Sequence, residues 1–178
     1  MSVAPVAAPD DGSLLRAVAS GDPQAFAVLV ERYQGSFFRL AARTVGDERE
    51  AQDCVQLAFF RIFRKARDYR PGLPAAPWLY RILTNACVDA WRRRRHEVLV
   101  AEPHVGATRP ADAATRIDLA AALARLPTQT RVVLLLHAME GLSNAEIAAI
   151  RGVSVNTVKT QIARARKQLR ALLGEERR

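Results

Sequence analysis

The sequence predicts an all-α protein in which two small helical domains are joined by a flexible linker. Apolar residues recur at steps of three and four along most of the 178-residue chain, which is the spacing of one buried helix face. Aromatic residues make up only 6% of the chain, and Ala and Leu are abundant; this composition favours helices over β-sheets. Over residues 96–115 the periodicity fades and Pro103, Gly106 and Pro110 interrupt the chain, as in a linker.

The N-terminal domain is expected over residues 13–95, after a disordered tail of residues 1–12 that is rich in Ala, Pro and Asp. Its longest helix is expected to begin at Asp22-Pro23, because Asp caps free backbone amides and Pro fits the first helical turn. That helix is expected to end at Gly46.

Asp47 can cap the next helix, which is expected over residues 48–67. Pro and Gly residues then predict a loop over residues 69–74. A further helix is expected from about Pro77 to Arg95, where it ends in a run of arginines. These segments together predict a small helical bundle.

The C-terminal domain is expected over residues 116–175 and contains a helix-turn-helix. Four helices are expected, near residues 116–126, 128–140, 143–151 and 155–173. Ser143 and Glu146 form a capping-box pattern at the start of the third helix. Gly152 supplies a tight turn and Ser154 caps the last helix. In modules of this kind the second helix of the pair lies in the major groove of DNA.

Charge supports a nucleic-acid partner for this module. The chain has 27 Lys and Arg residues against 18 Asp and Glu residues, a net charge of +9, which favours a polyanion. Between Ile147 and Gly174 there are six basic residues and no acidic one. The alternative is a basic amphipathic helix that packs on a neighbouring helix or on an acidic protein.

Two further surfaces are predicted in the N-terminal domain. A second row on helix 48–67 carries large apolar residues among polar ones, which suits a protein interface, although Leu57 and Phe60 could instead widen the core. The segment from Tyr69 to Arg95 mixes aromatic and basic residues. Aromatic faces stack on unpaired bases while arginines track phosphates, and the loop could form a pocket for a flipped base. The alternative is that these aromatics are core and that the arginine run is a solvated helix end.

Other classes of function find little support. The sequence has no phosphate-binding loop, carboxylate cluster or nucleophile with a base, so no catalytic residue and no cofactor is expected. The residues that a metal sensor could use lack a tight ligand spacing, so no metal site is expected; they are Cys54, Cys87, His96, His104 and His137. Without a signal peptide or an apolar run of spanning length, the protein is expected in the cytoplasm and not inserted in a membrane.

Several motifs together resemble one known family. They are Gly21-Asp22 with Ala25-Phe26, Leu29 and Arg32-Tyr33; Ala51, Asp53, Val55-Gln56, Phe59 and Arg61; Trp78-Leu79-Tyr80-Arg81-Ile82 with Asn85; Leu126-Pro127 with Arg131; Gly141-Leu142-Ser143 with Glu146-Ile147-Ala148; and Thr157-Val158-Lys159 with Ile162 and Arg164-Ala165-Arg166. In this order and spacing the motifs resemble extracytoplasmic-function (ECF) sigma factors of bacterial RNA polymerase. The resemblance covers nearly the whole chain outside the tail and the linker, with region 2 over residues 13–95 and region 4 over residues 116–175.

The resemblance implies a partner for each surface. Region 2 would bind the clamp helices of core RNA polymerase, and region 4 would bind its flap. The clamp-binding residues are Asp53, Gln56, Leu57, Phe60 and Arg61. The melted minus-10 strand of promoter DNA would be captured by Tyr69, Arg70, Trp78, Arg81, Asn85, Arg92 and Arg93. The minus-35 element would be read by Ser154, Asn156, Thr157, Lys159, Thr160, Arg164 and Lys167.

Some positions depart from the family pattern. Leu57 stands where an acidic residue is common, so the clamp contact is more apolar or serves another partner. Asn144 replaces a frequent aromatic, and Gln161 and Ala163 stand where Arg and His are frequent. Because no sizeable domain follows region 4, family habit implies a separate anti-sigma factor, with recruitment to the membrane where that partner resides there. The alternative function is a helix-turn-helix regulator that does not bind core polymerase.

Overall fold

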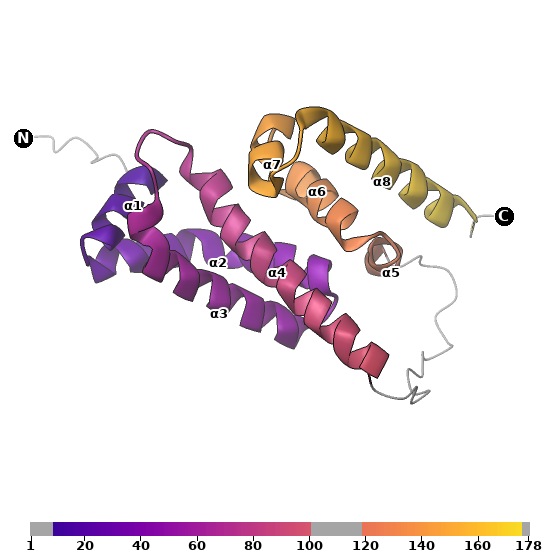
Figure 1. Ribbon diagram of the computed structural model, residues 1–178, viewed down its shortest axis with the longest axis horizontal. Helices are drawn as coiled ribbons and strands as arrows, with labels where there is room; N and C mark the ends of the chain where they lie inside the picture. The colour runs from indigo at the N-terminus through magenta and orange to yellow at the C-terminus, as the bar shows by residue number, and fades with distance from the viewer. Residues whose placement is uncertain (1–8, 101–118, 176–178) are drawn as a thin grey trace, which may run out of the picture.

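The computed structural model describes residues 9–100 and 119–175, and every regular element in those ranges is helical, which confirms the predicted fold class (Figure 1). The elements are α1 (Asp11–Ala19), α2 (Pro23–Val45), α3 (Glu48–Lys65), the short 3-10 helix η1 (Ala66–Asp68), α4 (Ala75–Val100), α5 (Leu119–Ala124), α6 (Thr128–Met139), α7 (Asn144–Arg151) and α8 (Val155–Glu175). None of the helices in the described ranges has the length and apolarity needed to cross a bilayer.

Side-chain caps begin the helices where local sequence predicts them. The Asp22 carboxylate accepts hydrogen bonds from the first amides of α2, at 2.8 and 3.2 Å. Asp47 does the same for α3 at 2.9 Å, and Ser154 accepts from the third amide of α8 at 3.1 Å. Ser143 and Glu146 form the complete capping box of α7. Each cap satisfies an amide that the helix itself leaves without an acceptor.

Several helix ends differ from the prediction: α3 gives way to η1 at Ala66, α4 begins at Ala75, α5 ends at Ala124 and α8 continues to Glu175. Two further differences have a local cause. Helix α1 begins at Asp11, inside the predicted tail of residues 1–12, because Asp10 caps it and Asp11 binds Tyr33 on α2. Helix α4 continues to Val100, beyond the end expected at Arg95, since no Gly or Pro interrupts the chain before Pro103. The rest of the predicted linker, and the start expected at Arg116, lie outside the described residues.

Helices α1 to α4 enclose the N-terminal part of the core. The largest buried side chains there are Leu15, Leu29, Phe37, Leu40, Ile62, Leu79 and Leu83. Phe63 continues the apolar stripe of α3 in sequence, yet it is 50% exposed. Its ring lies at the edge of the core, with its centroid 5.1 Å from that of Phe26. The buried stripe therefore passes from Ile62 to Ala66 of η1 and leaves Phe63 at its edge.

Helices α5 to α8 form the predicted helix-turn-helix. Val158, Ile162 and Ala165 of α8 are buried in the same hydrophobic core as Ile147 of α7. Gly152, between the two helices, has a φ of 65°, a left-handed conformation that glycine adopts without strain. The turn therefore directs α8 away from α7 with one face left to solvent.

The two groups of helices contact each other, with α7 against α4 and α6 against α2 (Figure 1). Arg131 of α6 is 5% exposed, and its Nη1 donates to the carbonyl of Thr44 on α2 at 2.6 Å. The Tyr80 hydroxyl on α4 donates to the Glu140 carboxylate. Burial and this carboxylate both raise the pKa of Tyr80. The two groups are thus joined by polar contacts at two points.

Candidate nucleic-acid interface

The outer face of α8 presents every residue that the sequence predicts for duplex recognition. All seven are exposed: Ser154, Asn156, Thr157, Lys159, Thr160, Arg164 and Lys167. Ser154 is occupied as the helix cap, and the Thr160 hydroxyl donates to the Asn156 carbonyl at 2.9 Å. An exposed amide near the helix start and cations along its length therefore face solvent together, which suits contact with base edges and phosphates.

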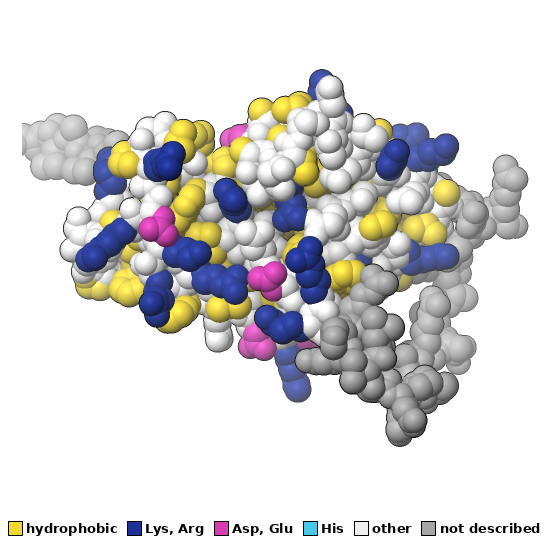
Figure 2. Space-filling model, viewed as in Figure 1, with side chains coloured by type: hydrophobic (Ala, Val, Ile, Leu, Met, Phe, Trp, Pro, Cys, Tyr) yellow, Lys and Arg dark blue, Asp and Glu magenta, His cyan; other side chains and the backbone are white. Residues whose placement is uncertain are grey.

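Positive charge also predominates around α3 and α4. On the face shown in Figure 2, Lys and Arg side chains outnumber Asp and Glu side chains. Arg70, Arg81, Arg92 and Arg93, all predicted to contact the minus-10 strand, are exposed. A polyanion that follows α4 would thus meet one cation after another.

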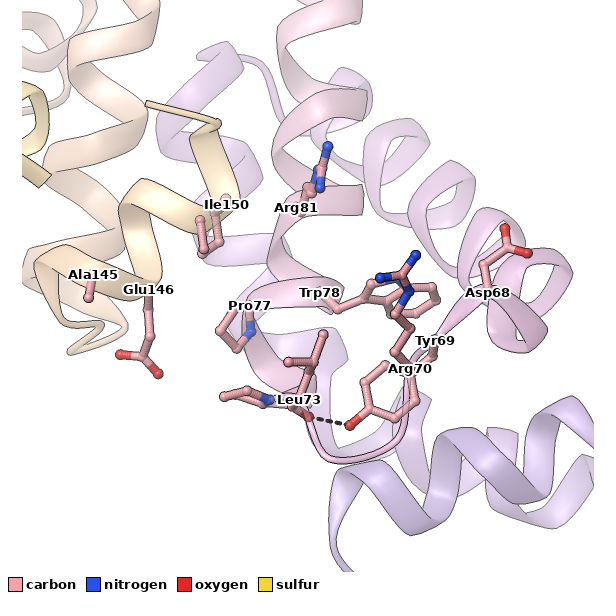
Figure 3. Close-up of a pocket in the computed structure, with 12 residues that line it drawn as sticks. Asp68, Tyr69, Arg70, Leu73, Pro77, Trp78, Arg81, Ala145, Glu146 and Ile150 are labelled. Carbon is pink, nitrogen blue, oxygen red and sulfur yellow. Dashed lines mark hydrogen bonds between the residues drawn. The ribbon is translucent and has the colours of Figure 1, made fainter. Parts of the chain in front are cut away.

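A cavity of about 570 Å³ lies beside the loop that precedes α4 (Figure 3). One wall holds four of the residues predicted to capture the minus-10 strand: Tyr69, Arg70, Trp78 and Arg81. The opposite wall is α7, with Ala145, Glu146, Ala149 and Ile150. The cavity combines aromatic and apolar surface with two guanidinium groups and with the carboxylates of Asp68 and Glu146. The rings suit an unpaired base, and the guanidinium groups suit its phosphate. Asn85, Arg92 and Arg93 do not line it and lie farther along α4.

Two residues of the loop differ from what the sequence indicates: Tyr69, predicted to contact DNA, is buried, and Leu73, absent from the predicted site, is exposed. Tyr69 is only 7% exposed, and its hydroxyl donates to the Leu73 carbonyl at 2.5 Å. The Leu73 side chain is 58% exposed and lines the cavity. Sequence reasoning missed Leu73, although an apolar residue in a loop of Pro and Gly was a usable signal.

The predicted protein interface on α3 is also exposed. Asp53, Gln56 and Phe60 face solvent, whereas Leu57 and Arg61 are half-buried. Phe60 is 57% exposed, so it does not widen the core. The Arg64 guanidinium lies 5.7 Å from the centroid of its ring. A large exposed ring beside polar groups is typical of a protein-binding surface.

Ion pairs join α3 to the part of α4 that carries the arginine run. Arg94 pairs with Glu50 at 3.4 Å, and Arg61 pairs with Asp89 at 3.6 Å. Arg93 lines a cavity that also includes Asp53 and Glu50. The sequence did not indicate these pairings, because Arg94 and Glu50 are 44 positions apart and Arg61 and Asp89 are 28 positions apart. The predicted polymerase face and the predicted DNA-binding arginines are therefore neighbours.

The two cysteines are buried together and no metal site accompanies them. A hydrogen bond between the two thiols lowers the pKa of Cys54 and raises that of Cys87. His137 contacts the Leu142 carbonyl at 3.3 Å. Among the described side chains, those of residues 9–94 and 119–173, no three His, Cys, Asp or Glu groups gather as metal ligands; the side chains of His96 and His104 lie outside these ranges.

Comparison with known proteins identifies the family. Residues 29–97 match Sigma-70 region 2, and residues 116–169 match Sigma-70, region 4. The ECF RNA polymerase sigma factor SigM of Mycobacterium tuberculosis is 37% identical over 166 residues, covering 92% of this chain and 85% of SigM. The chain belongs to the ECF family of RNA polymerase sigma factors. SigW of Bacillus subtilis, another ECF sigma factor, is 30% identical, and the match covers 89% of this chain and 94% of SigW.

Solved structures agree with the fold of this sigma factor. CnrH, in complex with the cytosolic domain of CnrY, is 34% identical with a TM-score of 0.72, covering 93% of this chain and 97% of its own. RpoE of Bartonella quintana, in complex with the anti-sigma factor NepR, is 25% identical with a TM-score of 0.69, covering 84% and 96%. The family and the fold that the sequence motifs predict are both confirmed.

Proposed function

We propose that this sigma factor binds core RNA polymerase and directs it to promoter DNA, where the sigma factor takes part in strand opening at the start of transcription. The observation that carries the proposal is that relatives matching nearly the whole chain, such as SigM, are RNA polymerase sigma factors. Binding energy drives strand opening and the polymerase performs the chemistry, so the chain needs no catalytic site of its own. Its place of action is the bacterial cytoplasm, on the nucleoid.

Region 2, over residues 13–95, would provide the main contact with the polymerase. The exposed ring of Phe60 and the neighbouring Gln56 and Asp53 are accessible on one face of α3. We assign this face to the clamp helices. The half-buried Leu57 and Arg61 would border the contact.

Region 2 would also capture the melted minus-10 strand. The cavity beside the loop offers Trp78 for stacking, with Arg70 and Arg81 for the phosphates. Asn85, Arg92 and Arg93 would extend the contact along α4. The captured base would enter the cavity after leaving the duplex, at a cost of a few kcal/mol in unstacking.

Region 4, over residues 116–175, would read the minus-35 element with α8 and contact the polymerase flap. The described part of α8 up to Leu173 has no acidic side chain, which favours approach to duplex DNA. The part of the chain after α4, which ends at Val100, would link the two regions. The alternative function, a helix-turn-helix regulator that does not bind polymerase, is not favoured because both sigma regions match within one chain.

A separate anti-sigma factor is the proposed regulator. The similar structure of RpoE is a complex with the anti-sigma factor NepR, and that of CnrH is a complex with the cytosolic domain of CnrY. Where the anti-sigma factor is a membrane protein, it would hold this chain at the membrane until a signal releases it. The departure at Leu57 would then serve either the clamp helices or this partner.

Core binding is tested by gel filtration of the sigma factor with core polymerase, using one variant on each surface. The wild type should co-elute with the polymerase. Phe60→Ala should weaken the affinity about tenfold or more, because truncating a buried interface aromatic costs about 2 kcal/mol. Leu73→Ala removes an equally exposed apolar side chain on the other surface and should keep wild-type core affinity. Equal losses in both variants, or no complex with the wild type, would contradict the assignment.

A further inference from the structure

One buried tyrosine, Tyr69, stabilises the loop between η1 and α4. Tyr69 is 7% exposed, and its ring meets Trp78 edge-on, with centroids 5.8 Å apart. Its hydroxyl donates to the Leu73 carbonyl at 2.5 Å, which ties the first part of the loop to its tip (Figure 3). Tyr69 therefore fixes both the loop tip and the indole that lines the cavity.

Gly12 of helix α1 leaves the space that the Tyr69 hydroxyl occupies. A Cβ added to Gly12 would lie 3.1 Å from the Tyr69 hydroxyl oxygen and 3.1 Å from Asp10 Oδ1. Both distances are tighter than ordinary van der Waals contact. Any side chain at this position would press on the hydroxyl that holds Leu73. The missing Cβ, rather than an unusual backbone conformation, is what Gly12 contributes.

Helix α1 is itself fixed to its surroundings. The Asp11 carboxylate accepts a hydrogen bond from Tyr33 of α2 at 2.6 Å and pairs with Arg32. At its other end, the Ala19 carbonyl accepts from Arg67 Nε of η1 at 3.2 Å. The helix is thus anchored to α2 and to the turn that leads into the loop, so it can act as a rigid support.

We propose that Tyr69, seated against Gly12 of α1, is a positioning residue for capture of the melted promoter strand and does not contact that strand itself. By holding the Leu73 carbonyl, it keeps the exposed Leu73 side chain and Trp78 in the arrangement that receives an unpaired base. Groups held in advance avoid the entropic cost of ordering them on binding. The inference rests on the proposed function of the loop and names the residue that shapes it.

Tyr69→Phe tests the proposal, because it removes the hydroxyl and keeps the ring. The assay uses core polymerase reconstituted with each variant and a fork-junction DNA from a mapped start site, with 2-aminopurine in the unpaired minus-10 strand. Tyr69→Phe should weaken capture of that strand about fivefold to tenfold, the usual effect of one lost hydrogen bond, and Gly12→Ala should weaken it similarly. Core affinity and binding of a minus-35 duplex should stay at the wild-type level.

Tyr80→Phe is the matched control, since it removes the hydroxyl of another buried tyrosine, one whose hydrogen bonds go to Ser36 and Glu140 and not to Leu73. It should leave strand capture unchanged. Wild-type capture by Tyr69→Phe, or equal losses in Tyr69→Phe and Tyr80→Phe together with equal falls in melting temperature, would overturn the proposal. Failure of the wild-type holoenzyme to bind any fork junction would instead overturn the proposed function.

Discussion

Arg131 is a buried cation that holds backbone carbonyls from two parts of the chain, and its replacement by methionine should destabilise the protein. Its side chain is 5% exposed. Nη1 donates to the Thr44 carbonyl at 2.6 Å, and Nη2 donates to the carbonyls of Ala124 at 2.8 Å and Leu126 at 3.0 Å. Methionine can fill much of the same space but cannot donate a hydrogen bond. The substitution therefore leaves these acceptors without their partner.

The magnitude follows from two opposing effects. The bonds to Thr44 and Leu126 are buried, and each buried acceptor left unpaired costs about 1–3 kcal/mol. Against this, burying the guanidinium is itself unfavourable, as the lowered pKa of Arg131 from desolvation indicates. We expect Arg131→Met to lower the free energy of unfolding by about 3 kcal/mol.

Urea denaturation followed by far-ultraviolet circular dichroism measures this loss. Arg125→Met is the matched control, because Arg125 is exposed and a surface substitution changes stability by about 0.5 kcal/mol or less. A loss below about 1 kcal/mol for Arg131→Met would contradict this prediction, since the carbonyls would then have found other partners.

Three further predictions concern α7 and α8. Lys159→Ala should weaken binding to every duplex and lower the slope of log affinity against log salt concentration by about one. Asn156→Ala should keep that slope and alter base preference in a sequence selection. An unchanged slope for Lys159→Ala would count against phosphate contact. Hydrogen bonds from Ser143 lower the pKa of Glu146 from its ordinary value of 4.5, so the ionised carboxylate stabilises the fold above pH 4.5, and this stabilisation is lost as pH falls through the lowered pKa. The difference in unfolding free energy between the wild type and Glu146→Ala should therefore shrink on acidification. A constant difference would contradict this. Gly152→Ala should cost about 1–2 kcal/mol by urea denaturation, because its φ of 65° strains any residue with a Cβ; unchanged stability would show that the turn can relax.

Local chemistry explains which parts of the fold the sequence could predict. Caps such as Asp22 and Ser143 bind amides two or three residues away, so their partners are visible in the sequence itself. The continuation of α4 past Arg95 was also readable, because no breaker occurs before Pro103. Phe63 was harder to predict, because periodicity gives the face of a helix but does not give the point at which the neighbouring helix ends.

The candidate site was predictable in composition but not in arrangement. Sequence patterning identified Arg70, Trp78 and Arg81 as a group, and they do line one cavity. It could not show that Tyr69 is buried, because the space that admits its hydroxyl depends on Gly12, 57 positions earlier in the chain. It also could not pair Arg131 with the Thr44 carbonyl, 87 positions away. Contacts of this kind depend on how helices pack and leave no periodic signal.

The most direct test of the account is transcription by core RNA polymerase reconstituted with this sigma factor on fragmented genomic DNA, followed by mapping of the transcript 5′ ends. We expect discrete start sites that share two sequence elements upstream and that disappear when the sigma factor is omitted. Initiation that is unchanged by adding the protein, or starts that share no upstream elements, would contradict it.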